Sequence, residues 1–237
     1  MKLLIATNNP GKLIEFQELL KDTNISLVTP AQIGLDLDVV EDGHTYAENA
    51  TKKAIAFAQA SHLISLADDS GLEVDALEGA PGLYSARFGS TDGKKLSDAE
   101  RRKYLLRQLQ DKPRPWNAHF HATVAIAIPS TRVTLPKEHP DDVSDSEGSL
   151  PQQTETLRSL RSLRVTDTDV YLAEGICPGE IIPEERGTGG FGYDPIFLLT
   201  ELGKTMAELS MDEKNHLSHR ARAVMKAKDV LMANFAK

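Results

Sequence analysis

The first part of the chain alternates short apolar runs with stretches of helical periodicity. Residues 2–6 form an apolar run that predicts a short buried strand, and residues 25–29 predict a second one. Between them, Asn9 is placed to cap a helix that has Pro10 in its first turn. Three apolar residues then recur at helical spacing: Leu13, Phe16 and Leu20. The pattern predicts a strand, a tight loop and a helix at the start of the chain.

Three further helices are predicted where a Ser or Thr is followed three positions later by Glu. These capping boxes begin at Thr45, Ser97 and Ser210. The first predicts a helix to about residue 60, with an apolar stripe made of Ala47, Ala50, Ala54, Ile55 and Ala58. Ser218 is expected to cap the last helix. The residues of that helix expected to face a core are Val224, Met225, Leu231, Met232 and Phe235.

Strand patterns occur at intervals along the chain and are most frequent in its second half. Residues 119–128 alternate apolar and polar, which predicts a half-buried strand. Residues 64–67 predict a short buried strand that runs into Asp68-Asp69-Ser70-Gly71, a sequence typical of a turn. Further strands are expected at 169–176, 180–182 and 195–199. Because strands and helices alternate first and strands cluster later, the expected fold class is α/β, a mixed twisted sheet with flanking helices in one domain.

Residues 136–167 differ from the rest of the chain in composition. Acidic residues lie there among serines, prolines and glutamines, and large apolar residues are sparse. This composition predicts a mobile polar insertion between two strands. Near its end, Arg158, Arg161 and Arg164 could form one face of a short helix. A solvated loop is the favoured interpretation, and a partner-binding arm is the alternative.

The charge balance and the single cysteine limit the kinds of function. A chain of 237 residues with 40% hydrophobic residues is long enough to bury a core. The formal net charge of −8 argues against binding to nucleic acid by bulk electrostatics. No apolar run approaches the roughly 20 residues of a membrane span, and residues 2–6 are too short a run for a signal peptide. Cys177 cannot form an internal disulfide, so a reducing cytoplasm is the expected location.

The loop Thr7-Asn8-Asn9-Pro10-Gly11-Lys12 joins the first strand to the first helix. A helix N-terminus binds anions because its unpaired N–H groups and its dipole point outward, and Lys12 adds a positive charge. The loop is not a Walker A motif, which needs a glycine at the position of Ala6 and a Ser or Thr at that of Leu13. Taken alone, it fits an ordinary strand-to-helix turn as well as a phosphate site.

Acidic residues supply a candidate metal site. The adjacent carboxylates of Asp68 and Asp69 repel each other after a buried strand, and proteins tolerate such pairs where Mg²⁺ binds. In open α/β sheets, ligands also bind at the carboxyl ends of strands. The alternative is a plain Asp-rich turn. Glu41-Asp42 precedes the helix that begins near Thr45, and this acid pair is relevant only if it faces Asp69.

A glycine-rich loop and the start of the last helix complete the candidate chemistry. Residues 187–195 hold four glycines in six positions, with Phe191 and Tyr193 among them. Such a loop can approach a ligand closely and stack rings on a flat base, or it can be a flexible hairpin whose aromatics fill the core. His219 and Arg220 lie where cations oppose the helix dipole, which hints at a ligand. No Ser–His–Asp, Cys–His or zinc pattern occurs, so a covalent nucleophile is not expected.

Five blocks of sequence are distributed along most of the chain. They are IATNNPGK at 5–12, YAENATKKA at 46–54, ADDSGLEVDALEGAPGLYSARF at 67–88, GTGGFGYDPIF at 187–197 and DEKNHLSHRARA at 212–223. In this order they resemble the inosine triphosphate pyrophosphatase family, which acts on noncanonical purine nucleoside triphosphates. Five ordered blocks are more specific than any one of them. Residues 136–167 are the clear departure from the family pattern.

The resemblance implies two lobes around a central cleft, a homodimer and dependence on Mg²⁺. It implies hydrolysis of ITP, dITP and XTP to the monophosphate and pyrophosphate, which cleanses the nucleotide pool. By motif position, Glu41 and Asp69 are the implied Mg²⁺ ligands, and Asp69 is also the implied base. The implied substrate contacts, from the triphosphate to the nucleoside end, are Thr7, Asn8, Asn9, Pro10, Gly11, Lys12, Lys53, Ser70, Phe191, Gly192, Tyr193, Asp194, Lys214, His219 and Arg220.

Several alternatives stay open at this point. The sequence does not decide whether Asp68 or Asp69 is the base that activates water for attack on the α-phosphorus. Arg220 or His219 would donate to a 6-oxo group and mispair with the amino group of adenine, at a cost of about 1–3 kcal/mol. A pyrophosphatase of pyrimidine or modified triphosphates, as in the Maf-like proteins, is a rival interpretation. A nucleotide-binding module without catalysis is another.

Overall fold

The computed structural model describes residues 2–91, 94–129, 161–165 and 168–235. Eight strands of this part form one mixed sheet in the order β2-β1-β3-β4-β6-β7-β8, with β5 also paired to β6. In chain order the strands are Lys2–Ile5, Ser26–Val28, Ile64–Val74, Trp116–Pro129, Arg161–Val165, Thr168–Ile181, Phe197–Leu199 and Lys204–Thr205. Strand β1 is parallel to β2 and β3, and the remaining pairs are antiparallel. The predicted α/β class with a mixed sheet is confirmed.

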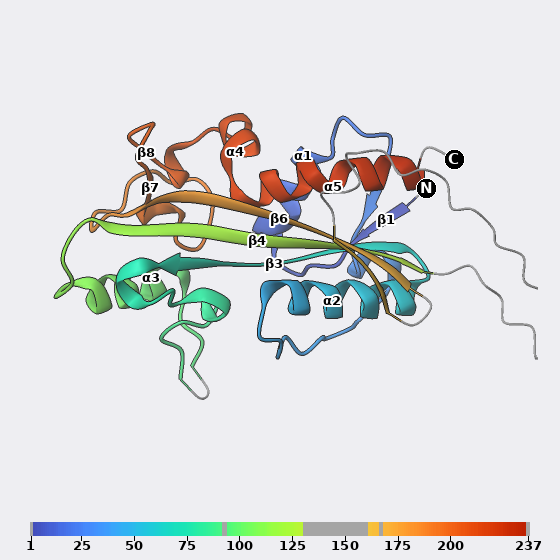
Figure 1. Cartoon of the computed structure of the whole chain (residues 1–237), viewed down its shortest axis with the longest axis horizontal. Coiled ribbons are helices and arrows are strands. Elements are labelled where there is room, and N and C mark those ends of the chain that lie inside the picture. Colours follow the sequence, from blue (N-terminus) through green and yellow to red (C-terminus); the bar gives the residue numbers. More distant parts are fainter. Residues whose placement is uncertain (1, 92–93, 130–160, 166–167, 236–237) are drawn as a thin grey trace, which may run out of the picture.

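Helices cover both faces of the sheet (Figure 1). They are α1 Pro10–Leu19, α2 Tyr46–Ser61, α3 Asp98–Leu109, α4 Met211–Leu217 and α5 His219–Phe235. Helices α1 and α5 pack on one face through Phe16, Val224 and Leu231, whereas α2 packs on the other through Ala50 and Ala54. None of the helices in the described part of the chain is long and apolar enough to cross a membrane.

The predicted helix caps are confirmed, with one difference. The Asn9 side chain caps α1, and complete capping boxes begin α3 at Ser97 and α4 at Ser210. At α2, the Thr45 hydroxyl accepts from the Glu48 N–H as expected. The Glu48 carboxylate, however, accepts from the N–H of the preceding residue, His44, at 2.7 Å. The second half of this cap therefore ties α2 to the loop before it.

Three long strands carry two cores. At one end, β3, β4 and β6 are enclosed between α2 and the pair α1 and α5. At the other end, Leu72 of β3 and Trp116 of β4 belong to a separate core with α3 and β7, in which Leu105 and Phe197 are fully buried. The strands thus extend from one packed region into a second one. A cleft between the two regions stays a prediction.

The predicted turn at residues 68–71 is wrong. Strand β3 continues through it to Val74, and each residue of the segment pairs with β4, from Asp68 opposite Val124 to Gly71 opposite His121. The pairing partner satisfies the backbone groups that a turn would have satisfied locally. The strands predicted at 169–176 and 180–182 are likewise one strand, β6, because β4 pairs with it along its whole length.

Other expectations fail because of the neighbours that the sheet receives. Strand β4 is buried on both faces from Ala122 to Ala127, not half-buried, because helices cover both sides. In α5, Met225 and Met232 are exposed, and alanines and Val230 face the core instead. The Phe235 side chain lies outside the described residues.

The expected insertion at 136–167 falls mostly outside the described residues. Its described part, Arg161–Val165, is strand β5, so the short helix expected around Arg161 and Arg164 is wrong. Strand β5 pairs antiparallel with the start of β6. This pairing, from Val165 opposite Thr168 to Arg161 opposite Leu172, holds the segment in the extended conformation.

Candidate functional site

The loop between β1 and α1 is exposed and is held by its own side chains. Asn9 accepts hydrogen bonds from the N–H groups of Gly11 and Lys12 at 2.9 and 3.3 Å, and Thr7 accepts from the N–H of Asn9 at 3.2 Å. Asn8, Asn9 and Pro10 are exposed at the surface. The helix dipole points at this loop, as expected for an anion site. Two of the amides expected to hold phosphate are already bonded to Asn9.

Asp68 and Asp69 point to opposite faces of the sheet. Successive side chains of a strand alternate between faces. Asp68 follows the face of Leu66, which packs with α1 and α5, whereas Asp69 follows the face of Ala67, which packs with α2. Their hydrogen-bond partners agree, because Asp68 meets Arg220 of α5 and Asp69 meets Asn49 of α2. The two carboxylates that were expected to form an adjacent pair therefore lie in separate environments on the two faces of the sheet.

Asp68 is buried among cations. Its Oδ2 lies 3.2 Å from Lys12 Nζ and accepts from Arg220 Nε and Nη2 at 3.0 and 2.9 Å and from the Ser70 hydroxyl at 3.3 Å. Burial alone would raise the pKa of Asp68, but Lys12 and Arg220 outweigh it and hold the pKa well below 3.8. A carboxylate held in this way is a poor proton acceptor.

Arg220 is enclosed by protein partners. Its side chain is 1% exposed. Besides Asp68, its Nη1 donates to Glu15 and its Nη2 donates to the Ser70 hydroxyl at 3.0 Å. The dipole penalty at the start of α5, which suggested a ligand, is thus offset by two carboxylates of the protein itself. These bonds use four of the five guanidinium N–H groups, so one N–H of Nη1 is left without a partner among the described residues.

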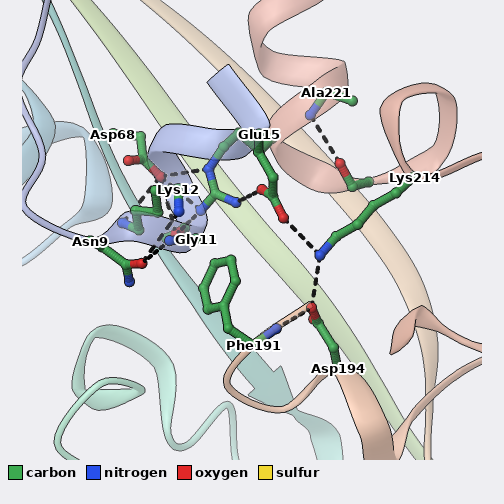
Figure 2. Close-up of polar contacts among 12 residues, drawn as sticks. Asn9, Gly11, Lys12, Glu15, Asp68, Phe191, Asp194, Lys214 and Ala221 are labelled. Atoms are coloured by element: carbon green, nitrogen blue, oxygen red, sulfur yellow. Dashed lines mark hydrogen bonds and ion pairs between the residues drawn. The ribbon is translucent and has the colours of Figure 1, made fainter. Parts of the chain in front are cut away.

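The ion pairs continue from Arg220 towards the glycine-rich loop. Lys214 Nζ lies 2.7 Å from Glu15 and 2.8 Å from Asp194. Six groups of alternating charge result, here called the charge network (Figure 2): Lys12, Asp68, Arg220, Glu15, Lys214 and Asp194. Burial would raise the pKa of Glu15, but the charges of Arg220 and Lys214 together lower it below 4.5. The network joins the start of α1 to the loop that ends at Asp194.

The glycine-rich loop places its two aromatic residues differently. Phe191 lies between the loop and α1, where a Cβ on Gly11 would come within 2.5 Å of its ring. The Phe191 N–H donates to Asp194 at 3.0 Å. Tyr193 is buried, and its hydroxyl donates to the carbonyl of Ser85 at 2.9 Å. Of the two rings expected to stack on a base, Tyr193 packs in the core in this structure.

His219 is a buried, uncharged residue. Its ring stacks on Phe120 with the centroids 4.8 Å apart and the planes 15° apart. Burial and then the charge of Arg220 lower the pKa of His219 well below 6.5. Its Nδ1 has no hydrogen-bond partner among the described residues. The imidazole is therefore neutral near pH 7 and has one ring nitrogen unpaired.

The environment of Asp69 is the reverse of that of Asp68. Its Oδ2 accepts from Asn49 Nδ2 at 2.9 Å, and its Oδ1 accepts from the Ser70 N–H at 2.9 Å. Burial raises its pKa above 3.8, and the negative charge of Glu41 acts in the same direction. Glu41 itself forms an ion pair with Lys53 of α2. The charge of Glu41 therefore acts on Asp69, and a direct facing of the two carboxylates stays a prediction.

Two buried residues of the site were not among those expected from the sequence. Glu15 occupies an ordinary position inside α1, yet it is 4% exposed and pairs with two cations. Asn49 lies inside α2 between residues of the apolar stripe and is 2% exposed. Only the packing of the helices on the sheet shows that Glu15 points at Lys214 and Arg220. The same packing shows that Asn49 points at Asp69.

Fold and site together define the class of protein. It is an α/β protein in which an exposed helix N-terminus, two buried cations and a carboxylate of raised pKa lie at the same part of a mixed sheet. This arrangement suits hydrolysis of a phosphorylated small molecule.

Comparison with known proteins identifies the family. The Ham1 family model matches residues 3–139 and 147–230. The dITP/XTP pyrophosphatase of Desulforamulus reducens is 40% identical over 232 residues, 98% of this chain and 96% of that protein. That of Bacillus subtilis is 36% identical over 97% of this chain and 96% of its own. A HAM1 protein structure from Coxiella burnetii superposes with a TM-score of 0.73 at 33% identity, covering 98% of this chain and 99% of that one.

The Ham1 protein of Staphylococcus aureus gives a TM-score of 0.70 at 31% identity, with 99% of this chain and 100% of that chain covered. The chain belongs to the Ham1 family. The resemblance found in the five sequence blocks is confirmed.

Proposed function

We propose that this chain hydrolyses noncanonical purine nucleoside triphosphates such as dITP, XTP and ITP to the monophosphate and pyrophosphate. Relatives that align over nearly their full length are named dITP/XTP pyrophosphatase. The observation that carries the proposal is the division of the two aspartates. One carboxylate is neutralised by Lys12 and Arg220, and the other has a raised pKa beside Glu41.

The triphosphate is bound by the start of α1 and by the lysines beside it. The exposed loop Thr7–Lys12 offers the positive end of the helix dipole. Lys12 is paired with Asp68, and Lys53 is paired with Glu41. Both ammonium groups can turn to phosphate oxygens without leaving the neighbourhood of these carboxylates. Ser70 contributes a hydroxyl that already bonds to Arg220 and Asp68.

Asp69 is the base in this proposal, and Asp68 is not. A general base must accept a proton near the working pH, which favours the carboxylate with the raised pKa. Asp69 orients and deprotonates the water that attacks the α-phosphorus, and pyrophosphate leaves. Asp68 keeps Lys12 and Arg220 in place. The opposite shifts of the two pKa values support this choice between the aspartates, which the sequence left open.

Glu41 and Asp69 are the proposed ligands of Mg²⁺. In the described part of the chain, no group of three or more His, Cys, Asp or Glu side chains forms a metal cage. Two carboxylates nevertheless fit Mg²⁺, which keeps several waters and takes further ligands from substrate phosphates. Burial raises the pKa of Asp69, the negative charge of Glu41 acts in the same direction, and a cation would relieve this repulsion between the two carboxylates. Bound Mg²⁺ supplies charge neutralisation and a more acidic water.

The nucleoside end is proposed to lie against Phe191. This ring is partly exposed, and it lies 5.4 Å from Lys214 Nζ and 5.8 Å from Arg220 Cζ, measured to the ring centroid. A base stacked there would have Lys214, Arg220 and His219 nearby as donors. Gly192, Tyr193 and Asp194 would then shape the loop without direct base stacking, because Tyr193 and Asp194 are buried.

The oligomeric state and the cellular location are further parts of the proposal. The family resemblance implies a homodimer, which size-exclusion chromatography with light scattering would test. A cytoplasmic location is in keeping with the single buried cysteine.

A panel of triphosphates tests the function. The purified chain is assayed with dITP, XTP, GTP, ATP and dUTP, with Mg²⁺ or with EDTA, and both products are quantified. We expect pyrophosphate and monophosphate from dITP and XTP, much slower turnover of GTP and ATP, and no turnover with EDTA. A preference for dUTP would favour the pyrimidine interpretation, and tight binding without pyrophosphate release would favour a binding module.

A further inference from the structure

Asn49 joins Asp69 to the loop that carries Glu41, and these are the two carboxylates proposed to hold the metal. We infer that Asn49 is a positioning residue that fixes the loop carrying Glu41 against Asp69, so that both carboxylates face one cation. The inference rests on the proposed function. It assigns a role in the metal site to a helix residue that itself supplies no metal ligand.

Both ends of the Asn49 amide are used, and each end has one possible role. Nδ2 donates to Asp69 Oδ2 at 2.9 Å, and Oδ1 accepts from the Gly43 N–H at 2.8 Å. A carboxylate can only accept and a backbone N–H can only donate, so the orientation of the amide is determined by its partners. A flipped amide would lose both bonds. The side chain is 2% exposed, so water would not readily replace either partner.

Gly43 fits the loop closely against α2. A Cβ at this position would lie 2.7 Å from Asn49 Oδ1 and 2.8 Å from Glu48 Cβ, and real Cβ atoms do not approach so closely. Glycine is therefore required for the loop to reach Asn49. The hydrogen bond and the missing side chain are two independent features of one contact.

Helix α2 holds the loop at other points too, but not in the same way. The Glu48 carboxylate accepts from His44, Lys53 pairs with Glu41, and Lys52 pairs with Asp42. Among the hydrogen bonds of the described residues, that of Asn49 is the one that connects this loop to Asp69. The others anchor the loop to the helix without setting its distance from the β3 carboxylate.

This geometry predicts an effect on metal affinity that exceeds the effect on the fold. Residues that orient metal ligands without binding the metal typically change affinity or activity by about 10–100-fold when they are replaced. Without Asn49, Glu41 would remain near Lys53, but its distance from Asp69 would be free to vary. The two carboxylates would then no longer be held for one ion.

The test compares Asn49→Ala and Gly43→Ala with the wild type and with a matched control, Lys52→Ala. Lys52 lies on the same helix and pairs with the same loop through an exposed ion pair, but it touches neither Gly43 nor Asp69. Binding of Mn²⁺ to the free protein is measured by electron paramagnetic resonance. The half-saturating Mg²⁺ concentration and the KM for dITP at saturating Mg²⁺ are measured alongside.

We expect Asn49→Ala and Gly43→Ala to weaken Mn²⁺ binding about tenfold and to raise the half-saturating Mg²⁺ concentration similarly. The KM for dITP at saturating Mg²⁺ and the behaviour of Lys52→Ala should stay within twofold of the wild type. Wild-type Mn²⁺ affinity in either folded variant would overturn the inference. Gly43→Ala decides the matter if Asn49→Ala does not fold. A wild type that binds no Mn²⁺ and releases no pyrophosphate would instead refute the proposed function.

Discussion

At the scale of single residues, Asp68 and Asp69 differ because they are neighbours in a strand. Alternation places one against Lys12 and Arg220 and the other against Asn49. The same chemical group is thereby a buried counter-ion on one face and a carboxylate of raised pKa on the other. Their local sequence does not distinguish them, whereas the sheet does.

Replacing each aspartate by asparagine should separate the two roles in stability. Asp68→Asn removes the buried counter-ion of Lys12 and one of the two counter-ions of Arg220, so we expect a loss of about 3 kcal/mol in the free energy of unfolding. Asp69→Asn removes a carboxylate that burial already disfavours in its charged form, so its free energy of unfolding should equal or exceed that of the wild type at pH 7. Urea unfolding measures both.

Equal losses of stability in the two variants would contradict this division.

The sequence predicted that these aspartates and Arg220 matter, because each stands in a block shared with the family. It could not predict that Arg220 binds Asp68 and Glu15, because these partners lie 152 and 205 positions away along the chain. Asn49 stands in one of the shared blocks and Glu15 in none, and neither has a local pattern that shows which partner it meets.

At the scale of elements, the N-terminus of α1 combines a helix cap with the proposed phosphate site. Asn9→Asp should keep the cap, since Asp and Asn cap helices about equally well. Its added negative charge should repel a triphosphate. We therefore expect an unchanged free energy of unfolding within about 0.5 kcal/mol and a KM for dITP raised at least tenfold, measured by urea unfolding and steady-state kinetics.

The matched control is Ser97→Asp at the start of α3, which also exchanges one good cap for another. It should leave the KM unchanged. If Asn9→Asp retains the wild-type KM, the phosphates do not bind at the start of α1.

Helix starts were the elements best predicted from the sequence, because a cap is a local interaction between residues two or three apart. The ends of strands were predicted less well. The segment at 68–71 has turn composition, but pairing with β4 extends it. The exposed Met225 shows a related limit, since apolar periodicity alone does not say which face of α5 meets the sheet.

At the scale of the whole molecule, the charge network ties α1, β3, α4, α5 and the glycine-rich loop together. Its carboxylate Glu15 has a pKa below 4.5, so the stability it provides is present above pH 4.5 and is lost as the pH falls through the lowered value. Glu15→Gln should therefore cost about 3 kcal/mol at pH 7, and the difference from wild type should shrink below pH 4.5.

Urea unfolding of the wild type and Glu15→Gln between pH 3 and 7 measures this dependence. Glu18→Gln serves as the control, because Glu18 lies on the same helix as Glu15 and pairs with Lys21 in an exposed position. A difference that stays constant across the pH range would show that Glu15 contributes by packing and not by its charge.

The mixed sheet and the order of most elements could be predicted from the sequence, because hydrophobic periodicity and helix caps depend on residues close together in the chain. The two separate cores could not, since they depend on how far β3, β4 and β6 extend. For the proposed site, the sequence supplied most of the candidate residues but neither Glu15 nor Asn49, and the register of β3 on β4 supplied the distinction between the two aspartates.

The most direct test of the central claim follows the oxygen of the attacking water. Wild type and Asp69→Asn are incubated with dITP and Mg²⁺ in ¹⁸O-labelled water, and the products are analysed by ³¹P nuclear magnetic resonance. We expect the label to enter the monophosphate and unlabelled pyrophosphate to be released. Asp69→Asn should slow the formation of both products by about 10²–10⁴-fold. Label in the pyrophosphate, or undiminished turnover in Asp69→Asn, would contradict it.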